Sequence, residues 1–179
     1  AVRTGRPAGA ARARALLEEP STRVELRLNL IQLLGETGDS ADADRLLGLV
    51  SSGPEPVQLA APDTLPAFDR AELASELLQR YPRLSPRARA RVREVLLSRQ
   101  AWARAILHEV QAGRLAPSDF TMEELRVVSL HQDPELNELV HKHWGSVSRG
   151  TAEEKLAEMR RLNNDLNAGP CEPARGREV

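Results

Sequence analysis

The chain has 179 residues, a length typical of about one domain, and its formal charge of −1 at pH 7 excludes a strong overall attraction to nucleic acid or anionic membranes. Aromatic residues make up 3% of the sequence, so the core has to be built mainly from leucine, alanine and valine, a composition that favours helices. The single cysteine, Cys171, excludes an internal disulfide framework and a multi-cysteine metal site, and no apolar run reaches the about 18 residues of a membrane-spanning helix.

Helix-start signals recur along the chain. In a capping box, a hydroxyl side chain and a glutamate three residues later each accept a backbone N–H at the beginning of a helix. Elsewhere a capping side chain precedes a proline, whose missing N–H does no harm at the first helical position. The capping boxes are Thr22–Glu25, Thr121–Glu124 and Thr151–Glu154, and the cap-proline pairs are Ser85-Pro86 and Asp133-Pro134.

Apolar residues recur every three or four positions, which is the period of an amphipathic helix. The clearest stripes are Ala88-Val92-Val95-Leu96, Trp102-Ile106-Val110, Leu136-Leu139-Val140-His143-Trp144 and Ala152-Leu156-Met159-Leu166. In chain order, the start signals and stripes together predict helices over residues 8–19, 22–35, 40–51, 55–61, 68–80, 86–98, 100–112, 121–131, 134–145 and 151–167.

Two segments do not show a clear helical pattern. Residues 23–30 alternate polar and apolar side chains as a strand would, but the apolar positions are mainly leucine and the pattern continues to about a helix length, so we predict a helix. Residues 52–67 carry four prolines, which predict a broken helix or a loop.

Short connections between the predicted helices favour antiparallel neighbours, and two helices in about 40 residues match the period of HEAT and armadillo repeats. We therefore predict an all-α solenoid of antiparallel helix pairs over residues 20–168. Residues 1–19 are predicted to be a frayed helix or linker, and the glycine- and proline-rich residues 169–179 a further linker.

Histidines and carboxylates are the first candidates for chemistry. His141 and His143 are two positions apart on one predicted helix, so they point to different faces and cannot share a metal ion. His108 and His131 belong to other helices. The acidic residues Asp63, Asp69, Glu72 and Glu76 form no recognisable acid–base pair, although an enzyme would be indicated if Asp63, Asp69, His108 and His131 converged on one pocket.

A local basic cluster offers a second possibility, a nucleic-acid-binding surface. Its members are Arg83, Arg87, Arg89, Arg91, Arg93, Arg99 and Arg104. Helical spacing spreads these side chains around the helix, and acidic residues balance them along the chain, so an ordinary solvated surface is the simpler interpretation. Trp102 and Trp144 lie on apolar stripes and are expected in the core, and Cys171 has no histidine or basic residue beside it in its linker.

Several short stretches carry a family resemblance. They are Leu77–Pro86 (LLQRYPRLSP), Leu96–Ala103 (LLSRQAWA), Val110–Asp119 (VQAGRLAPSD), His131–Glu135 (HQDPE) and Pro173–Val179 (PARGREV). In this order they resemble the region ahead of the c-type haem domain in the PVC-type haem-binding, membrane-bound-dehydrogenase-like proteins of planctomycetes. The resemblance covers roughly residues 20–179 and consists of many weak words, without one strong motif.

The resemblance implies a parent protein with a β-propeller, a HEAT-like region and a terminal cytochrome c-like domain, and residues 169–179 would then include the beginning of that domain. It implies a c-type haem bound downstream of Val179, electron transfer and a periplasmic or other extracytoplasmic location. Pro62 and Pro66 depart from the family by interrupting a helix, and Cys171 does not correspond to a haem cysteine. No functional residue of the family carries over to a position in this chain.

The sequence thus predicts a non-catalytic scaffold that positions the other domains of a larger protein. The chain itself is expected to hold no catalytic residue, cofactor or metal, to insert into no membrane, and to bind other domains of the same parent or a protein partner. The alternative is a nucleic-acid-binding HEAT-like module that uses the cluster Arg83–Arg104.

Overall fold

The structure is a computed structural model that describes residues 7–37, 39–68, 70–145, 156–157 and 159–164. Contacts divide the chain into two units, residues 1–147 and residues 148–179. In the second unit, the described residues 156–157 and 159–164 are helical and exposed, and they belong to the predicted helix 151–167. Residues 169–179, including Cys171, lie outside the described residues.

All regular secondary structure in the described part of the first unit is helical, which confirms the predicted all-α class. The α-helices are α1 (Pro7–Glu18), α2 (Val24–Thr37), α3 (Ser40–Leu49), α4 (Glu55–Thr64), α5 (Leu73–Arg80), α6 (Pro86–Leu97), α7 (Gln100–Gln111), α8 (Met122–Ser129) and α9 (Pro134–Trp144). Short 3-10 helices cover Leu65–Ala67, Tyr81–Arg83 and Pro117–Asp119.

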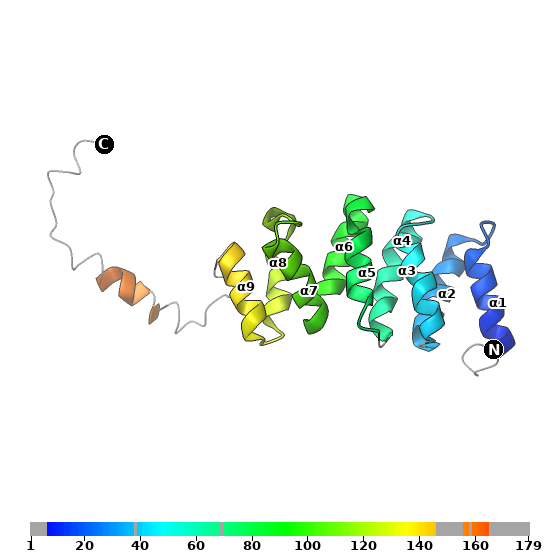
Figure 1. Cartoon of the computed structure of the whole chain (residues 1–179), viewed down its shortest axis with the longest axis horizontal. Coiled ribbons are helices and arrows are strands. Elements are labelled where there is room, and N and C mark those ends of the chain that lie inside the picture. The colour runs from blue at the N-terminus through cyan, green and yellow to red at the C-terminus, as the bar shows by residue number, and fades with distance from the viewer. Residues whose placement is uncertain (1–6, 38, 69, 146–155, 158, 165–179) are drawn as a thin grey trace. The chain divides into compact units, whose positions relative to one another are not determined.

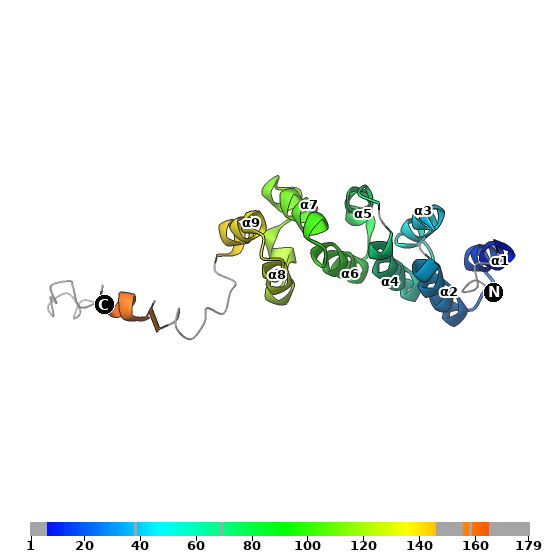
Figure 2. The same cartoon turned by 90° about the horizontal axis from the view of Figure 1, so that it is seen from below.

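The helices of the first unit follow one another in a row and lie in two layers (Figures 1 and 2). In the layer that we call the even-numbered layer, α2 contacts α4, α4 contacts α6 and α6 contacts α8. In the odd-numbered layer, α3 contacts α5, α5 contacts α7 and α7 contacts α9. Contacts such as α3 with α4, α6 with α7 and α8 with α9 join the layers, so most helices have neighbours both beside and behind them.

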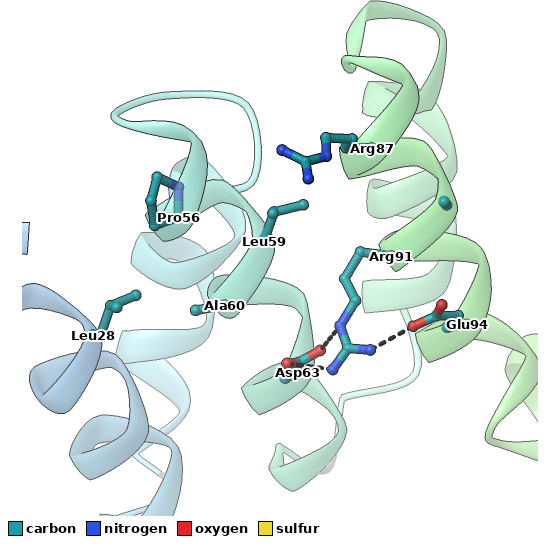
Figure 3. A pocket seen from close by; sticks show the side chains of 9 residues that line it. Leu28, Pro56, Leu59, Ala60, Asp63, Arg87, Arg91 and Glu94 are labelled. Atoms are coloured by element: carbon teal, nitrogen blue, oxygen red, sulfur yellow. Dashed lines mark hydrogen bonds and ion pairs between the residues drawn. The ribbon is translucent and has the colours of Figure 1, made fainter. Parts of the chain in front are cut away.

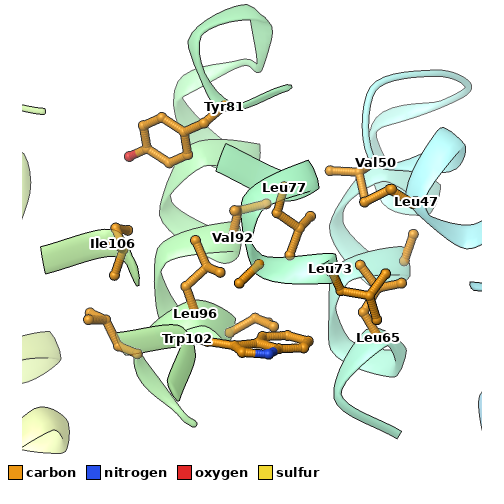
Figure 4. Packing of buried hydrophobic residues seen from close by; sticks show 14 of the residues in the cluster. Leu47, Val50, Leu65, Leu73, Leu77, Tyr81, Val92, Leu96, Trp102 and Ile106 are labelled. Atoms are coloured by element: carbon orange, nitrogen blue, oxygen red, sulfur yellow. The ribbon is translucent and has the colours of Figure 1, made fainter. Parts of the chain in front are cut away.

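Aliphatic side chains fill the space between the two layers (Figure 4). Leu65, Leu73, Leu77 and Leu96 are fully buried there, and each fully buried leucine contributes about 1.5–3 kcal/mol relative to an exposed one. Trp102 is 4% exposed, so its predicted place in the core is confirmed. One cluster of buried side chains extends from α1 to α9, so the first unit has a continuous core.

Three of the predicted helix starts are formed, and the one at Thr151–Glu154 lies outside the described residues. The Thr121 side chain accepts the Glu124 N–H and the Glu124 carboxylate accepts the Thr121 N–H, which completes a capping box at α8. Ser85 and Asp133 cap α6 and α9 as predicted. The box predicted at Thr22 is wrong: α2 begins at Val24, and the Arg23 carbonyl accepts the N–H of Arg27 at 3.1 Å, so the helix starts one residue later than a Thr22 cap requires.

The ambiguous segment 23–30 is helical from Val24 onward, as predicted. The proline-rich segment 52–67 forms more helix than expected, because α4 reaches Thr64 before a 3-10 turn begins at Leu65. Pro56 lies in the first turn of α4, where its missing N–H has no partner to lose, whereas Pro62 lies inside the last turn and removes one helical hydrogen bond.

The N-terminal helix belongs to the packed unit, whereas the sequence suggested a frayed helix or linker over residues 1–19. Leu17 is fully buried against its neighbours, and α1 contacts α2. Two hydrogen bonds also join α1 to α3: Arg14 Nε donates to Asp42 Oδ1 at 2.7 Å and Arg14 Nη2 donates to Asp42 Oδ2 at 2.9 Å. Asp42 is completely buried, so this fork of charged hydrogen bonds holds a carboxylate that otherwise would be costly to bury.

A second polar junction joins α7 to α9. The Asp133 carboxylate caps α9 by accepting the Leu136 N–H at 3.1 Å, and it also accepts hydrogen bonds from the side chains of Gln100 and Arg104. The Gln100 hydrogen bond, followed by the Leu136 N–H, holds the pKa of Asp133 below its usual value. Because the folded pKa is the lower one, the junction contributes its full stability above the unfolded pKa of about 3.9 and loses it as the pH falls through the folded pKa.

We expect the free energy of unfolding to fall more steeply between about pH 5 and pH 3 in the natural chain than in Asp133→Asn, since asparagine still caps a helix but does not titrate. Urea unfolding followed by circular dichroism at several pH values measures this slope. Parallel slopes for the two proteins would contradict the role assigned to Asp133. Asp39 and Glu109, whose pKa values are also lowered by hydrogen bonds, remain in both proteins and set the common background slope.

Close packing of α2 on α4 depends on a glycine. A Cβ atom added at Gly35 would lie 2.8 Å from Thr64 Cβ, well inside a normal contact. Gly48, in α3, has nothing within 4 Å of the same added atom. Both glycines lie within helices, so they differ mainly in the space around them.

We therefore expect Gly35→Ala to lower the free energy of unfolding by about 1–3 kcal/mol, because α2 and α4 have to move apart. The matched variant Gly48→Ala should raise it by about 0.5–1 kcal/mol, because alanine restricts the unfolded chain and favours the helix. Denaturant unfolding measures both values. Equal effects of the two substitutions would show that the contact at Thr64 is not limiting.

Candidate binding surface on the even-numbered helices

The outer face of the even-numbered layer has an open groove of about 560 Å³ across α2, α4 and α6 (Figure 3). Its apolar part consists of Leu28 from α2, Pro56, Leu59 and Ala60 from α4, and Ala90 from α6. Charged side chains surround this apolar part: Asp63 from α4, and Arg87, Arg91 and Glu94 from α6. We call it the α4–α6 groove.

The charged groups of the α4–α6 groove are largely paired with one another. Arg91 Nε lies 2.7 Å from Asp63 Oδ1, and a second nitrogen of Arg91 binds Glu94, so one guanidinium serves two carboxylates. These hydrogen bonds, the one to Asp63 first, raise the pKa of Arg91. Arg87 Nη1 lies 3.2 Å from Glu55 Oε2, but the Arg87 side chain is 75% exposed. An exposed ion pair of this kind contributes only about 0.2–1 kcal/mol to stability.

A second groove of about 290 Å³ lies between α6 and α8, and we call it the α6–α8 groove. One wall is formed by the α6 residues Ala90, Arg93, Glu94 and Leu97, and the other by Thr121, Glu123, Glu124 and Val127 at α8. Ala90 and Glu94 line both grooves. Because the Ala90 side chain is small, α6 forms only a low ridge between the two grooves. The grooves are therefore neighbouring parts of one surface.

An ion pair at the base of the α6–α8 groove connects its two walls. Arg93 Nε donates to Glu124 Oε1 at 3.0 Å, and both side chains are close to buried, at 11% and 9% exposure. Arg93 also donates to the Tyr81 hydroxyl at 3.0 Å, and Glu124 accepts the Thr121 N–H at 2.7 Å. The spacing of α6 and α8 is therefore set by a connected set of hydrogen bonds, so the groove exists before any partner binds.

Large apolar side chains are also exposed on α8 and just after it. Met122 is 45% exposed, Val127 40% and Leu130, just after the helix, 78%. Leu125 and Val128, on the opposite side of the same helix, are fully buried. An exposed group of large apolar side chains on one helix is typical of a contact surface, whereas single exposed leucines are common.

The predicted basic cluster is divided between different faces and is mostly paired. Arg87 and Arg91 lie in the α4–α6 groove, Arg93 binds Glu124, and Arg104 on α7 lies 2.7 Å from Asp133 in the odd-numbered layer. Arg89 donates to the backbone carbonyls of Leu84 and Pro82, Arg99 lies over the Trp102 ring, and Arg83 is exposed at the end of a 3-10 helix. The structure does not gather these arginines into one positive stripe.

The candidate histidines lie in different places. Nε2 of His108, on α7, lies 3.3 Å from Glu135 Oε1. His131 Nε2 lies 2.7 Å from the Leu97 carbonyl oxygen. His141 is exposed on α9, and the His143 ring packs edge-on against half-buried Trp144. In the described residues, no three His, Cys, Asp or Glu side chains are arranged to hold a metal ion.

The acidic candidates do not join these histidines. Asp63 belongs to the α4–α6 groove, whereas Glu76 binds Arg70, whose Nε also lies 3.9 Å from Glu72. Asp69 lies outside the described residues. Asp63 binds Arg91, His108 lies beside Glu135 and His131 lies beside the Leu97 carbonyl, so each has a different partner, and neither groove described above is lined by all three.

The groove residues Leu28, Leu59, Ala90, Glu94 and Val127 were not singled out from the sequence. A signal was present in α6, where Arg87-Ala90-Arg91-Glu94 and Ala90-Arg93-Glu94-Leu97 each follow the spacing of one helix face. These faces mix charged and small side chains, so they look like ordinary solvated surface until the neighbouring helices are known.

Comparison with known proteins adds no family assignment, because no protein-family model, curated protein or solved structure matches this chain. None of the helices in the described part of the chain combines the length and hydropathy needed to span a membrane. The geometry of the even-numbered layer is thus the main guide to function.

The ion pair at the base of the α6–α8 groove can be tested with neighbouring glutamates. Glu124→Gln keeps a side chain suited to the capping box but removes the charge opposite nearly buried Arg93, so we expect it to lower the free energy of unfolding by about 1–3 kcal/mol. Glu123→Gln, whose side chain is 81% exposed, should change it by less than about 0.5 kcal/mol. Denaturant unfolding distinguishes these values, and equally small effects would show that Arg93 and Glu124 do not hold the walls together.

Proposed function

We propose that the first unit is a HEAT- or armadillo-like α-solenoid that acts as a non-catalytic interaction scaffold. Support for the solenoid comes from the alternation of successive helices between two layers, in which each helix packs mainly on its near neighbours. Repeat modules of this kind stack helix pairs into a continuous core and expose an extended face for binding.

The observation that carries the proposal is the pair of neighbouring grooves on one face of the even-numbered layer. Both grooves are lined in part by apolar side chains, both share Ala90 and Glu94, and the exposed Val127 of α8 lines the second of them. A shallow, extended surface of this kind suits another polypeptide better than a small molecule, which is usually enclosed on most sides.

The resemblance seen in the sequence suggests the setting of this scaffold. In a PVC-type haem-binding parent, the module would lie between a propeller and a cytochrome c-like domain and would hold them in a fixed arrangement. The parent would carry a c-type haem downstream of Val179 and would act outside the cytoplasm. These features belong to the proposal and rest on the resemblance alone.

The alternative, a nucleic-acid-binding module, receives less support from the geometry. Phosphate binding needs several free cations on one face, yet Arg91 and Arg93 are already paired with carboxylates in the even-numbered layer, and Arg104 is paired in the odd-numbered layer. Binding would have to break these pairs. Salt-sensitive binding of duplex DNA that weakens in Arg87→Ala and Arg91→Ala would nevertheless restore it.

The parent can be tested by its covalent haem. We expect this chain, expressed with a c-type haem maturation system, to stay colourless, and the gene to encode a Cys-x-x-Cys-His motif within about 15 residues after Val179. Absorbance spectra and the downstream gene sequence provide the measurements. Stoichiometric covalent haem on this chain would contradict a haem-free scaffold, and a downstream sequence without the motif would contradict the parent assignment but not the scaffold.

The scaffold is tested by photo-crosslinking in the parent polypeptide. Benzoylphenylalanine in place of Leu59 lies in the α4–α6 groove and should form an adduct with another domain or partner. The same residue in place of Ala101, exposed on α7 in the odd-numbered layer, serves as the matched control. Equal labelling from both positions, or none from position 59, would contradict a binding role for the even-numbered face.

A further inference from the structure

The α6–α8 groove has room for side chains of a partner but not for a folded domain. Its volume of about 290 Å³ is near the lower limit of natural ligand pockets, which start at about 300 Å³. Ala90, Leu97 and Val127 supply its apolar surface. One or two aliphatic side chains, presented by a peptide segment, match this size and polarity.

The charged side chains around the groove indicate which kind of peptide segment it would bind. Its lining has one cation, Arg93, and three carboxylates, Glu94, Glu123 and Glu124. Arg93 is committed to Glu124 at the base, so the two carboxylates at the rim determine what a partner meets.

Neither rim carboxylate is firmly neutralised. Glu94 shares Arg91 with Asp63, which leaves this group of three side chains with a surplus negative charge. Glu123 pairs with Arg126 three residues along the same helix, and the Glu123 side chain is 81% exposed. Exposed pairs within a helix contribute only about 0.2–0.5 kcal/mol, so a cation from a partner can compete with Arg91 and Arg126 for these carboxylates.

We propose that the α6–α8 groove binds a basic, aliphatic protein segment, whose aliphatic side chains enter between α6 and α8 while its lysine or arginine side chains pair with Glu94 and Glu123. An acidic segment would meet the surplus negative charge at the rim. Val127, which is 40% exposed, supplies the apolar contact on the α8 wall. This inference rests on the proposed scaffold function and names the chemistry of its partner.

The probes are two fluorescein-labelled peptides that share the same leucines at helical spacing, one with lysines and the other with glutamates at the remaining positions. Fluorescence anisotropy with the full chain at low ionic strength should show binding of the lysine peptide only. The affinity should fall as salt is added, because exposed charge pairs are screened. Failure of the lysine peptide to bind, or equal binding of both peptides, overturns the inference.

Substitutions then place the binding site. The double variant Glu94→Lys with Glu123→Lys should lower the affinity for the lysine peptide by at least about tenfold. The control variant Glu138→Lys, at an exposed position on α9 in the odd-numbered layer, should leave this affinity unchanged. Ala90→Trp should also weaken binding because the indole fills the groove. Circular dichroism confirms that each variant remains folded, and the charge variants alone decide the matter if Ala90→Trp does not fold.

The outcomes separate this inference from the scaffold proposal. Binding of the glutamate peptide that is lost in Ala90→Trp would overturn the charge assignment while supporting a binding role for the groove. Unchanged affinity in the double variant would overturn the inference by placing the peptide elsewhere. The crosslink from position 59 is independent of both results, because it reports on the α4–α6 groove in the parent.

Discussion

The arrangement of the first unit depends on the burial of apolar helix faces against more than one neighbour. A single amphipathic helix of ten to fourteen residues is not stable alone in water, so each helix here gains its stability from its contacts. In α6, Val92 and Leu96 are fully buried, and the helix contacts α4, α7 and α8. Because none of the helices described in the first unit covers the outer side of the even-numbered layer, the grooves between α4, α6 and α8 are open in this unit.

Polar contacts fix the distances between particular helices, which apolar burial alone does not do. Arg14 with Asp42 joins α1 to α3, Arg104 with Asp133 joins α7 to α9, and Arg93 with Glu124 joins α6 to α8. The second and third pairs each connect helices in the same layer. The directional hydrogen bonds of Arg93 with Glu124 hold α6 and α8 at a fixed distance, and this distance sets the width of the α6–α8 groove.

The same arginines that suggested nucleic-acid binding thus have structural partners. A guanidinium is the natural group for this work, since its planar fork binds a carboxylate at two points and it stays charged at all relevant pH values. Arg91 and Arg93 are separated by one residue on α6, and for that reason they point toward α4 and α8 respectively. The basic residues of α6 thus form ion pairs with two neighbouring helices. The glutamates at the rim of the α6–α8 groove are therefore the charged side chains that a partner can reach more easily.

The helices and most of their ends could be predicted from the sequence, because capping and apolar period are local properties. Thr121 with Glu124, Ser85 and Asp133 act within a few residues of the backbone groups they bind, so their roles could be predicted. The misplaced cap at Thr22 shows that a capping pattern can match one residue before the position where the helix begins. Other contacts became visible only in the assembled fold: Arg14 binds Asp42, Gly35 lies against Thr64, and Ala90 lies between two grooves. These contacts join residues far apart in the chain, and no local period records which helix faces lie opposite one another or which side of a layer stays uncovered.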